Sequence, residues 1–122
     1  MIQTSGVDHV VLHVNDVQRA KKFYTDVLGM TVYREDDRQV FLHAGQQGVA
    51  LFEKEGGAPL TAGNDLNHLA LNVASGTYET LKSRGVEITD EPSPKPYGID
   101  FGIRDPFGNA IRIGQMFDNA DA

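Results

Sequence analysis

The sequence predicts an α+β fold built from two βαβββ modules. A β-branched segment, Val7–Val14, leads directly into apolar residues spaced three and four apart, which is typical of a strand followed by an amphipathic helix. The pattern restarts in the second half, where NHLALNVAS (Asn67–Ser75) repeats DHVVLHVND (Asp8–Asp16) in residue type. His68 takes the place of His9 in this repeat. A supersecondary unit used twice predicts two related modules in a pseudo-twofold arrangement.

Length and composition exclude several classes of protein. A chain of 122 residues is expected to form a single domain with a core that needs no disulfide, and it contains no Cys. Thiol nucleophiles, iron–sulfur clusters and Cys-type zinc sites are therefore excluded. The net charge of −6 argues against nucleic acid and anionic membranes as partners. The sequence predicts no transmembrane helix and no signal peptide, so a cytoplasmic protein is expected.

The first module has the clearer helix of the two. We expect Asn15 or Asp16 to cap it and Gly29 to end it. The helix has one apolar stripe, formed by Val17, Ala20, Phe23, Tyr24, Val27 and Leu28. The strands predicted after it lie near Met30–Tyr33, Val40–His43 and Val49–Phe52.

The second module follows a Gly-rich linker and repeats the order of the first. Its helix is expected to carry Tyr78 and Leu81 and to end at Gly85. The predicted strands lie near Val86–Thr89, Ile99–Ile103 and Ala110–Ile113. We expect Pro92, Pro94 and Pro96 to form a stiff loop before the last two strands. Module one is thus predicted at about 7–55, the linker at about 56–65 and module two at about 66–117 of one domain covering 1–122.

Strand alternation places two histidines at equivalent points of the two modules. Val10, Leu12 and Val14 are expected to face the helix, whereas His9 and, in the second module, His68 and Asn72 face the other side. Two imidazoles in such positions can hold one metal ion, although a metal site normally has a third protein ligand. A pair of hydrogen-bonded sheet histidines is the alternative.

Arg112 is the second candidate for chemistry. It lies in a predicted strand after the turn Arg104–Asn109 (RDPFGN), and alternation sends it away from the core, as it does Ala50 in the first module. A guanidinium there suits a carboxylate or phosphate on a ligand. An intramolecular ion pair with one of the 17 acidic residues is the alternative. The sequence contains no dinucleotide fingerprint, P-loop or GxSxG motif.

These motifs resemble those of the vicinal oxygen chelate superfamily, which groups glyoxalase I, extradiol dioxygenases, fosfomycin-resistance enzymes and bleomycin-binding proteins. The resemblance covers about Val7 to Gln115 and is carried by DHVVLHVNDVQRAKKFYTDVLGM, NHLALNV and RDPFGNAIRI. It implies the glyoxalase/bleomycin-resistance/dioxygenase fold, in which paired βαβββ modules form a cupped mixed sheet. It also implies a homodimer and a cavity for a small molecule.

The resemblance also implies a metal site, from which this sequence departs. The family's histidine positions match His9 and His68, but its two carboxylate positions hold Ala50 and Arg112. A cation beside Arg112 would be repelled. Glu53 is the nearest substitute ligand and the one candidate catalytic base, although alternation places it on the same side as Val49 and Leu51, so only a bulge would turn it inward. Asp100 and Asn72 are further candidates for the missing ligand.

Two functions follow from these residues, beside a third interpretation in which the chain is a structural or interaction protein with a vestigial cavity. The first is a binding protein of the resistance or sequestration type with a degenerate metal site. Its concave cleft would bind a small organic molecule through a set of five ligand-binding residues. That set is Arg112, Ala50, Asn72, His9 and His68. An anionic ligand is the kind that Arg112 would favour. The alternative is a lyase, isomerase or dioxygenase that depends on one divalent ion (Ni, Mn, Fe or Zn) held by His9 and His68, with Glu53 or water completing its shell.

Overall fold

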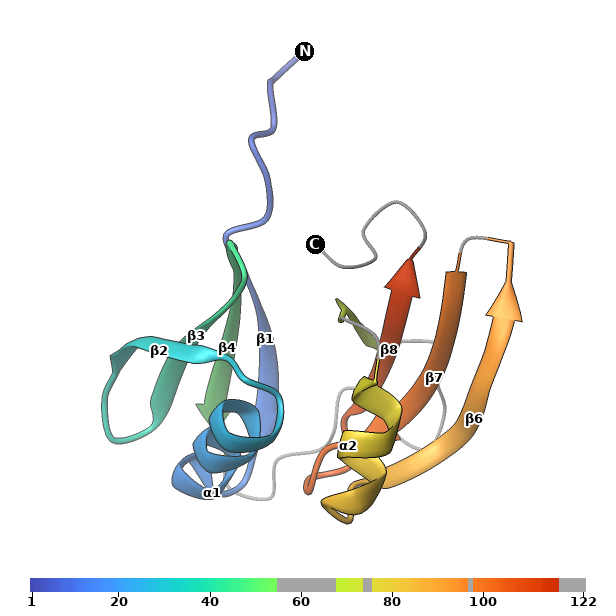
Figure 1. The fold of residues 1–122 in the computed structure, drawn as a ribbon. Helices are drawn as coiled ribbons and strands as arrows, with labels where there is room; N and C mark the ends of the chain where they lie inside the picture. Colours follow the sequence, from blue (N-terminus) through green and yellow to red (C-terminus); the bar gives the residue numbers. More distant parts are fainter. Residues whose placement is uncertain (55–67, 74–75, 97, 117–122) are drawn as a thin grey trace. The chain divides into compact units, whose positions relative to one another are not determined.

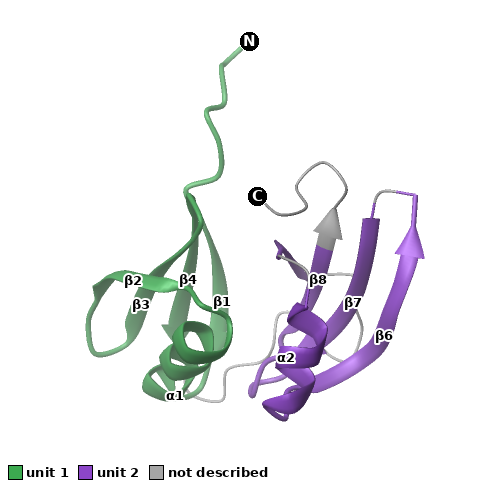
Figure 2. Ribbon diagram, in the orientation of Figure 1, with its two compact units in different colours: residues 1–58 green, residues 59–122 purple. Residues whose placement is uncertain are grey.

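The computed structural model describes residues 1–54, 68–73, 76–96 and 98–116 of the chain. The chain divides into two compact units, Met1–Ala58 and Pro59–Ala122 (Figure 2). This division falls within the linker predicted at about 56–65, which lies outside the described residues. Each unit contains its own four-stranded mixed sheet and a helix, which confirms the predicted α+β class (Figure 1).

Unit 1 has the predicted order of one strand, one helical segment and three strands. Its sheet order is β1-β4-β3-β2, in which β1 pairs with β4 in parallel and the other pairs are antiparallel. The elements are β1 (His9–Val14), α1 (Val17–Lys22), the π-helical turn η1 (Phe23–Val27), β2 (Thr31–Glu35), β3 (Gln39–Ala44) and β4 (Gln47–Glu53).

The core of unit 1 lies between α1 and one face of the sheet. α1 packs against β3 and β4, and its buried residues are Val17 and Ala20. The strand residues on this face are almost completely buried: Leu12, Val14, Val40, Leu42, Val49 and Leu51. Alternation thus assigns the first strand correctly at Leu12 and Val14, but Val10, near the start of β1, is 39% exposed.

The helix begins as predicted and changes geometry in its second half. The side chain of Asp16 accepts a hydrogen bond from the backbone N–H of Arg19, so Asp16 is the N-cap. The stripe continues into the π-helical turn, where Tyr24 is completely buried. Gly29, with φ of 72°, follows the turn, in the left-handed conformation that the predicted helix end requires.

Unit 2 repeats the topology of unit 1. Its sheet order is β5-β8-β7-β6, again with a parallel pair between the first and last strands of the unit. The elements are β5 (Leu69–Asn72), α2 (Thr77–Ser83), β6 (Glu87–Lys95), β7 (Gly98–Arg104) and β8 (Ala110–Met116). The side chain of Tyr78 on α2 contacts the ring of Phe101, so α2 lies on the face of the sheet that also carries Ile111 and Ile113. Within the described residues, no helix is long and apolar enough to cross a bilayer.

The turn before β8 is held by a buried carboxylate. Asp105 Oδ1 accepts hydrogen bonds from the backbone N–H groups of Phe107 and Asn109 at 2.9 and 2.8 Å, and its Oδ2 accepts one from Asn109 Nδ2. Gly108 has a φ of 90°, which a side chain would disfavour. This turn fixes where β8 begins and therefore which face Arg112 occupies.

Most of the proline-rich segment forms a strand, so the loop predicted at Pro92 and Pro94 is wrong, whereas Pro96 lies in a turn. Pro92 and Pro94 lie inside β6, which continues to Lys95. β6 is the edge strand of its sheet, and its pairing with β7 shifts register between Asp90 and Ser93. Proline is tolerated at edges and bulges because the missing N–H is not needed there.

Candidate functional site

In unit 1, the sheet face opposite α1 carries a cluster of aromatic rings. Strand residues that pair in register share a face, and Ala50 on β4 pairs with Val11 and with Phe41. Phe41 lies at the centre of the cluster. Its ring contacts those of His9 and Phe52 edge-on, with centroids 5.7 and 5.8 Å apart. Such edge-to-face contacts are the preferred geometry of aromatic pairs.

A bulge adds a further ring to this face. The pairing of β2 with β3 shifts register between Val32 and Arg34, at Tyr33. The Tyr33 ring stacks on His43 at 4.1 Å between centroids and also contacts Phe41 at 6.1 Å. The guanidinium carbon of Arg34 lies 4.2 Å from the centre of the Phe41 ring. We call Tyr33, Phe41, His43, Phe52 and His9 the aromatic face of unit 1.

The aromatic face is partly open. Tyr33 is 45% exposed and His43 is also exposed, whereas Phe52 is half-buried and Phe41 is buried. Ala50, a predicted contact for a ligand, is completely buried, so its methyl group offers no surface in this structure. A ligand with a planar ring would find aromatic rings to stack against here.

His9 lies at the edge of this cluster with a defined partner. Its Nδ1 donates a hydrogen bond to Asp8 Oδ2 at 2.7 Å, and the His9 side chain is 33% exposed. When Nδ1 holds the proton of a neutral imidazole, Nε2 is the acceptor or metal-ligating atom. Contact between His9 and a ligand or metal ion remains a prediction.

Glu53 lies on the opposite face, so the structure does not bring it to His9. Register is continuous along β1 and β4 up to the pair Val14 and Glu53, without the bulge that would turn Glu53. Glu53 Oε1 accepts a hydrogen bond from the backbone N–H of Val17 at 2.9 Å. Its carboxylate therefore satisfies one of the free N–H groups at the start of α1. This helix contact is the physical reason why Glu53 is a poor candidate for a metal ligand or a base.

In unit 2, the face opposite α2 carries Arg112 within an ion cluster. Arg112 Nη1 and Nη2 donate to the two carboxylate oxygens of Asp90 at 2.6 and 3.1 Å. Arg112 Nη2 also lies 3.1 Å from Asp100 Oδ2, to which Nε donates at 3.3 Å. The intramolecular ion pair that the sequence left open is therefore present. The anion contact predicted for Arg112 remains untested, but its guanidinium already has two carboxylate partners.

The pKa values in this cluster move in the directions that pairing requires. Hydrogen bonding from Arg112 lowers the pKa of Asp90, although partial burial opposes the shift. The pKa of Arg112 is raised, chiefly by its hydrogen bond to Asp90. Both groups are therefore charged at neutral pH.

Asn72 and His68 are the other predicted contacts in this unit. Ala70 pairs with Arg112 and Asn72 pairs with Gly114, so Asn72 shares the face of Arg112 and is exposed. His68 precedes β5 and is exposed. His9 belongs to unit 1 and His68 to unit 2, and their convergence on one metal ion stays a prediction.

The residues on these faces do not fit the metal site that the resemblance implies. The described residues contain no group of three or more His, Cys, Asp or Glu side chains arranged to hold a metal ion. Ala50 has no donor atom, and Arg112 is a cation where a carboxylate is needed. Glu53 is engaged at the start of α1.

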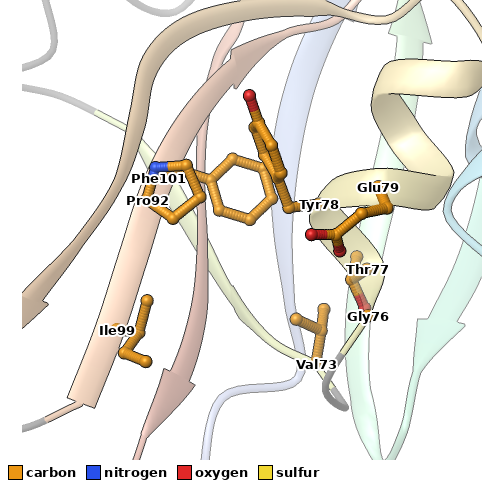
Figure 3. Close-up of a pocket in the computed structure, with 8 residues that line it drawn as sticks. All are labelled: Val73, Gly76, Thr77, Tyr78, Glu79, Pro92, Ile99 and Phe101. Atoms are coloured by element: carbon orange, nitrogen blue, oxygen red, sulfur yellow. The ribbon is translucent and has the colours of Figure 1, made fainter.

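A small pocket lies on the other side of the unit 2 sheet, between α2, β6 and β7 (Figure 3). Its volume is about 70 Å³. The hydroxyl of Tyr78 donates to Glu91 Oε2, a bond that raises the pKa of Tyr78. The lining residues are Val73, Gly76, Thr77, Tyr78, Glu79, Pro92, Ile99 and Phe101.

Sequence reasoning missed Asp90 and the rings around Phe41. The spacing of Phe41 and His43 on one strand places both on one face, which is a readable signal. The bulge at Tyr33 and the length of β6 depend on strand pairing, so no local pattern indicated them.

The comparisons with known proteins agree with the fold and with the motifs. The model of the Glyoxalase/Bleomycin resistance protein/Dioxygenase superfamily matches residues 6–113, so this chain belongs to that superfamily. It is 31% identical over 122 residues to a probable lactoylglutathione lyase of Vibrio cholerae, with 88% of each chain covered.

Two solved structures share the fold. The antibiotic-binding protein TnmS3 from Streptomyces sp. CB03234 has a TM-score of 0.79 at 23% identity, covering 95% of this chain and 99% of its own. The fosfomycin resistance protein FosX from Listeria monocytogenes, solved with Mn(II) and a sulfate ion, has a TM-score of 0.77 at 19% identity. The match covers 93% of this chain and 92% of FosX. The relative and the two structural neighbours are thus named for lyase activity, antibiotic binding and antibiotic resistance.

Proposed function

We propose that this chain is a small-molecule-binding protein of the resistance or sequestration type, acting as one domain over residues 1–122. The observation that supports it best is the aromatic face of unit 1, where rings surround Phe41 and Tyr33 remains 45% exposed. Aromatic side chains lose little conformational entropy on binding and offer large contact areas. The expected ligand therefore contains a planar, mostly apolar ring.

The ion cluster of unit 2 makes an anionic ligand, which the sequence favoured, a weaker candidate. Arg112 is paired with Asp90 and Asp100, so it offers less attraction to an anionic ligand than a free guanidinium would. Ala50 and Arg112 stand where the family has carboxylates, which supports binding without a metal. Assembly as a homodimer and a cytoplasmic location remain predictions from the resemblance and the composition.

Titration of the ¹⁵N-labelled protein with benzyl alcohol, an uncharged aromatic probe, tests this function. We expect saturable shifts of the amide signals of Tyr33, Phe41 and Phe52 in the millimolar range. An absence of saturable shifts, or shifts confined to other parts of the chain, would contradict the proposal.

The alternative is a lyase, isomerase or dioxygenase that depends on one divalent ion held by His9 and His68. The name of the Vibrio cholerae relative, a probable lactoylglutathione lyase, favours it. The test is the metal content of the purified protein, followed by calorimetric titration of the metal-stripped form with nickel, manganese, iron(II) and zinc. Stoichiometric binding that is lost in both His9→Ala and His68→Ala would support the enzyme over the binding protein.

A further inference from the structure

Asp100 on β7 is a buried carboxylate with one unused oxygen. The residue is only 7% exposed, and among the described residues its Oδ1 has no hydrogen-bond partner. The other oxygen, Oδ2, accepts from Arg112. A buried acceptor without a partner is costly, so it calls for a physical explanation.

The donors of Arg112 cannot supply the missing bond where they lie. Nε is directed to Asp100 Oδ2, and Nη1 to Asp90 Oδ1. Nη2 is shared between Asp90 Oδ2 and Asp100 Oδ2. The guanidinium is thus held in one orientation, in which Asp100 Oδ1 is left over.

The charge of the cluster has a definite sign. One guanidinium faces two carboxylates, so the group formed by Arg112, Asp90 and Asp100 is net negative when all three are ionised. A carboxylate or phosphate that approaches this face would meet both aspartates. An ammonium or another N–H group would instead be attracted.

The neighbours of Asp100 in the sheet are small. Its register partners are Ser93 on β6 and Gly114 on β8, which lie on the same face. Gly102, two residues further along β7, also lacks a side chain, and the ends of Thr89, Asp90 and Arg112 occupy the space beside it. The ion cluster therefore contacts Asp100 on one side, and the residues beside Asp100 on the two neighbouring strands are small.

From these contacts we infer that Asp100 Oδ1 accepts a hydrogen bond from a ligand, and that this face selects ligands with an ammonium or another N–H donor over anionic ones. The inference rests on the proposed small-molecule binding, concerns the face of unit 2 by itself, and specifies the chemical class of the molecule that this face accepts. Asp100 is the residue that contacts the ligand in this inference, and Arg112 is a positioning residue.

The test compares three aromatic probes of similar size: benzylammonium, benzyl alcohol and benzoate. The dissociation constant of each is measured from the amide signals of unit 2, by ¹⁵N NMR titration of the full chain at pH 7 and low salt. Because a hydrogen bond to a charged group changes an equilibrium by about ten-fold or more, we expect benzylammonium to bind about ten-fold more tightly than benzoate. The amide signals of Asp100, Gly102 and Arg112 are expected to move with benzylammonium.

Asp100→Asn is the decisive variant because it keeps the shape of the side chain. Its amide oxygen would remain towards Arg112, which places the NH₂ group, a donor, where Oδ1 now lies. The preference for benzylammonium over benzoate should therefore fall by about ten-fold or reverse. Asp37→Asn, which removes the same charge from an exposed turn of unit 1, is the matched control and should leave the preference unchanged.

Asp90→Asn provides a second variant should Asp100→Asn fold poorly. It removes one charge from the cluster but leaves Asp100 Oδ1 in place, so the preference for benzylammonium should persist in reduced form. The inference would be overturned if benzoate bound as tightly as benzylammonium, or if the Asp100→Asn protein kept the wild-type preference. In either case, binding of benzyl alcohol would leave the proposed function standing. Failure of all three probes to bind would overturn both.

Discussion

Gly102 and Arg112 face each other across β7 and β8, and a Cβ atom at Gly102 would lie only 2.7 Å from Arg112 Nη1. The same Cβ would lie 2.3 Å from Thr89 Oγ1 and 2.5 Å from Asp90 Oδ1. The absence of a side chain at Gly102 is therefore a condition for the ion cluster.

Gly102→Ala should destabilise the protein and loosen the contact between Asp90 and Arg112. The atoms in its way are ends of side chains, so we expect a loss of about 1 kcal/mol in the free energy of unfolding. Gly48→Ala should cost more, because its Cβ would lie 2.2 Å from the backbone oxygen of Asp8. Urea denaturation of both variants checks this order, and a smaller loss for Gly48→Ala would contradict it.

The stabilisation by Asp90 should depend on pH below about 4. Arg112 lowers the pKa of Asp90 in the folded protein relative to the unfolded value of about 3.9. The contribution is thus complete well above pH 4 and is lost as the pH falls through the lower, folded pKa. The difference in unfolding free energy between the wild type and Asp90→Asn should accordingly shrink between pH 5 and pH 2. A difference that grows on acidification would exclude this account.

Glu53 should prove to be structural. Glu53→Ala removes the acceptor for the backbone N–H of Val17, so we expect a loss of about 1 kcal/mol in unfolding free energy. Glu53→Gln keeps an acceptor oxygen and should recover much of the loss. Urea denaturation measures both variants. If Glu53→Gln abolished metal binding or turnover without changing stability, Glu53 would regain its place as a candidate ligand or base.

Tyr33 should contribute to ligand binding more than to folding. Its ring is exposed on one side and contacts Phe41 and His43, so Tyr33→Ala should cost about 1 kcal/mol of stability. Binding of benzyl alcohol should weaken several-fold, as measured by NMR titration. Val10→Ala, which removes an exposed apolar side chain from the other face of the sheet, serves as control. Equal weakening in both variants would argue against a site at Tyr33.

The sequence predicted the topology because periodic patterns decide it. Alternation placed Leu12 and Val14 in the core, and the repeat of the His9 segment at His68 predicted a second unit with the same strand order. The prolines in the second half of β6 instead suggested a loop, since the position of a strand at the edge of a sheet is not written in its local sequence.

The candidate site could be predicted only in part. Alternation placed Arg112 on the correct face, but its partners Asp90 and Asp100 come from two other strands, and their distance depends on register. The sequence therefore identified the cation without deciding between its two possible roles. Tyr33 lies on the aromatic face because of a bulge. A bulge adds one residue to a strand, so the side chains after it no longer follow the simple alternation between the two faces.

The parallel pairing of the first and last strands in each unit has a consequence for folding during synthesis. β1 has β4 as its only neighbour in the described sheet, and β5 has β8. The first strand of a unit therefore stays unpaired until the ribosome has released the last one. Contacts of such long sequence separation slow folding, because the intervening loop must close before any bond forms. We expect nascent chains that end before Gln47 to remain sensitive to proteases, and chains that extend past the linker to contain a protected first unit.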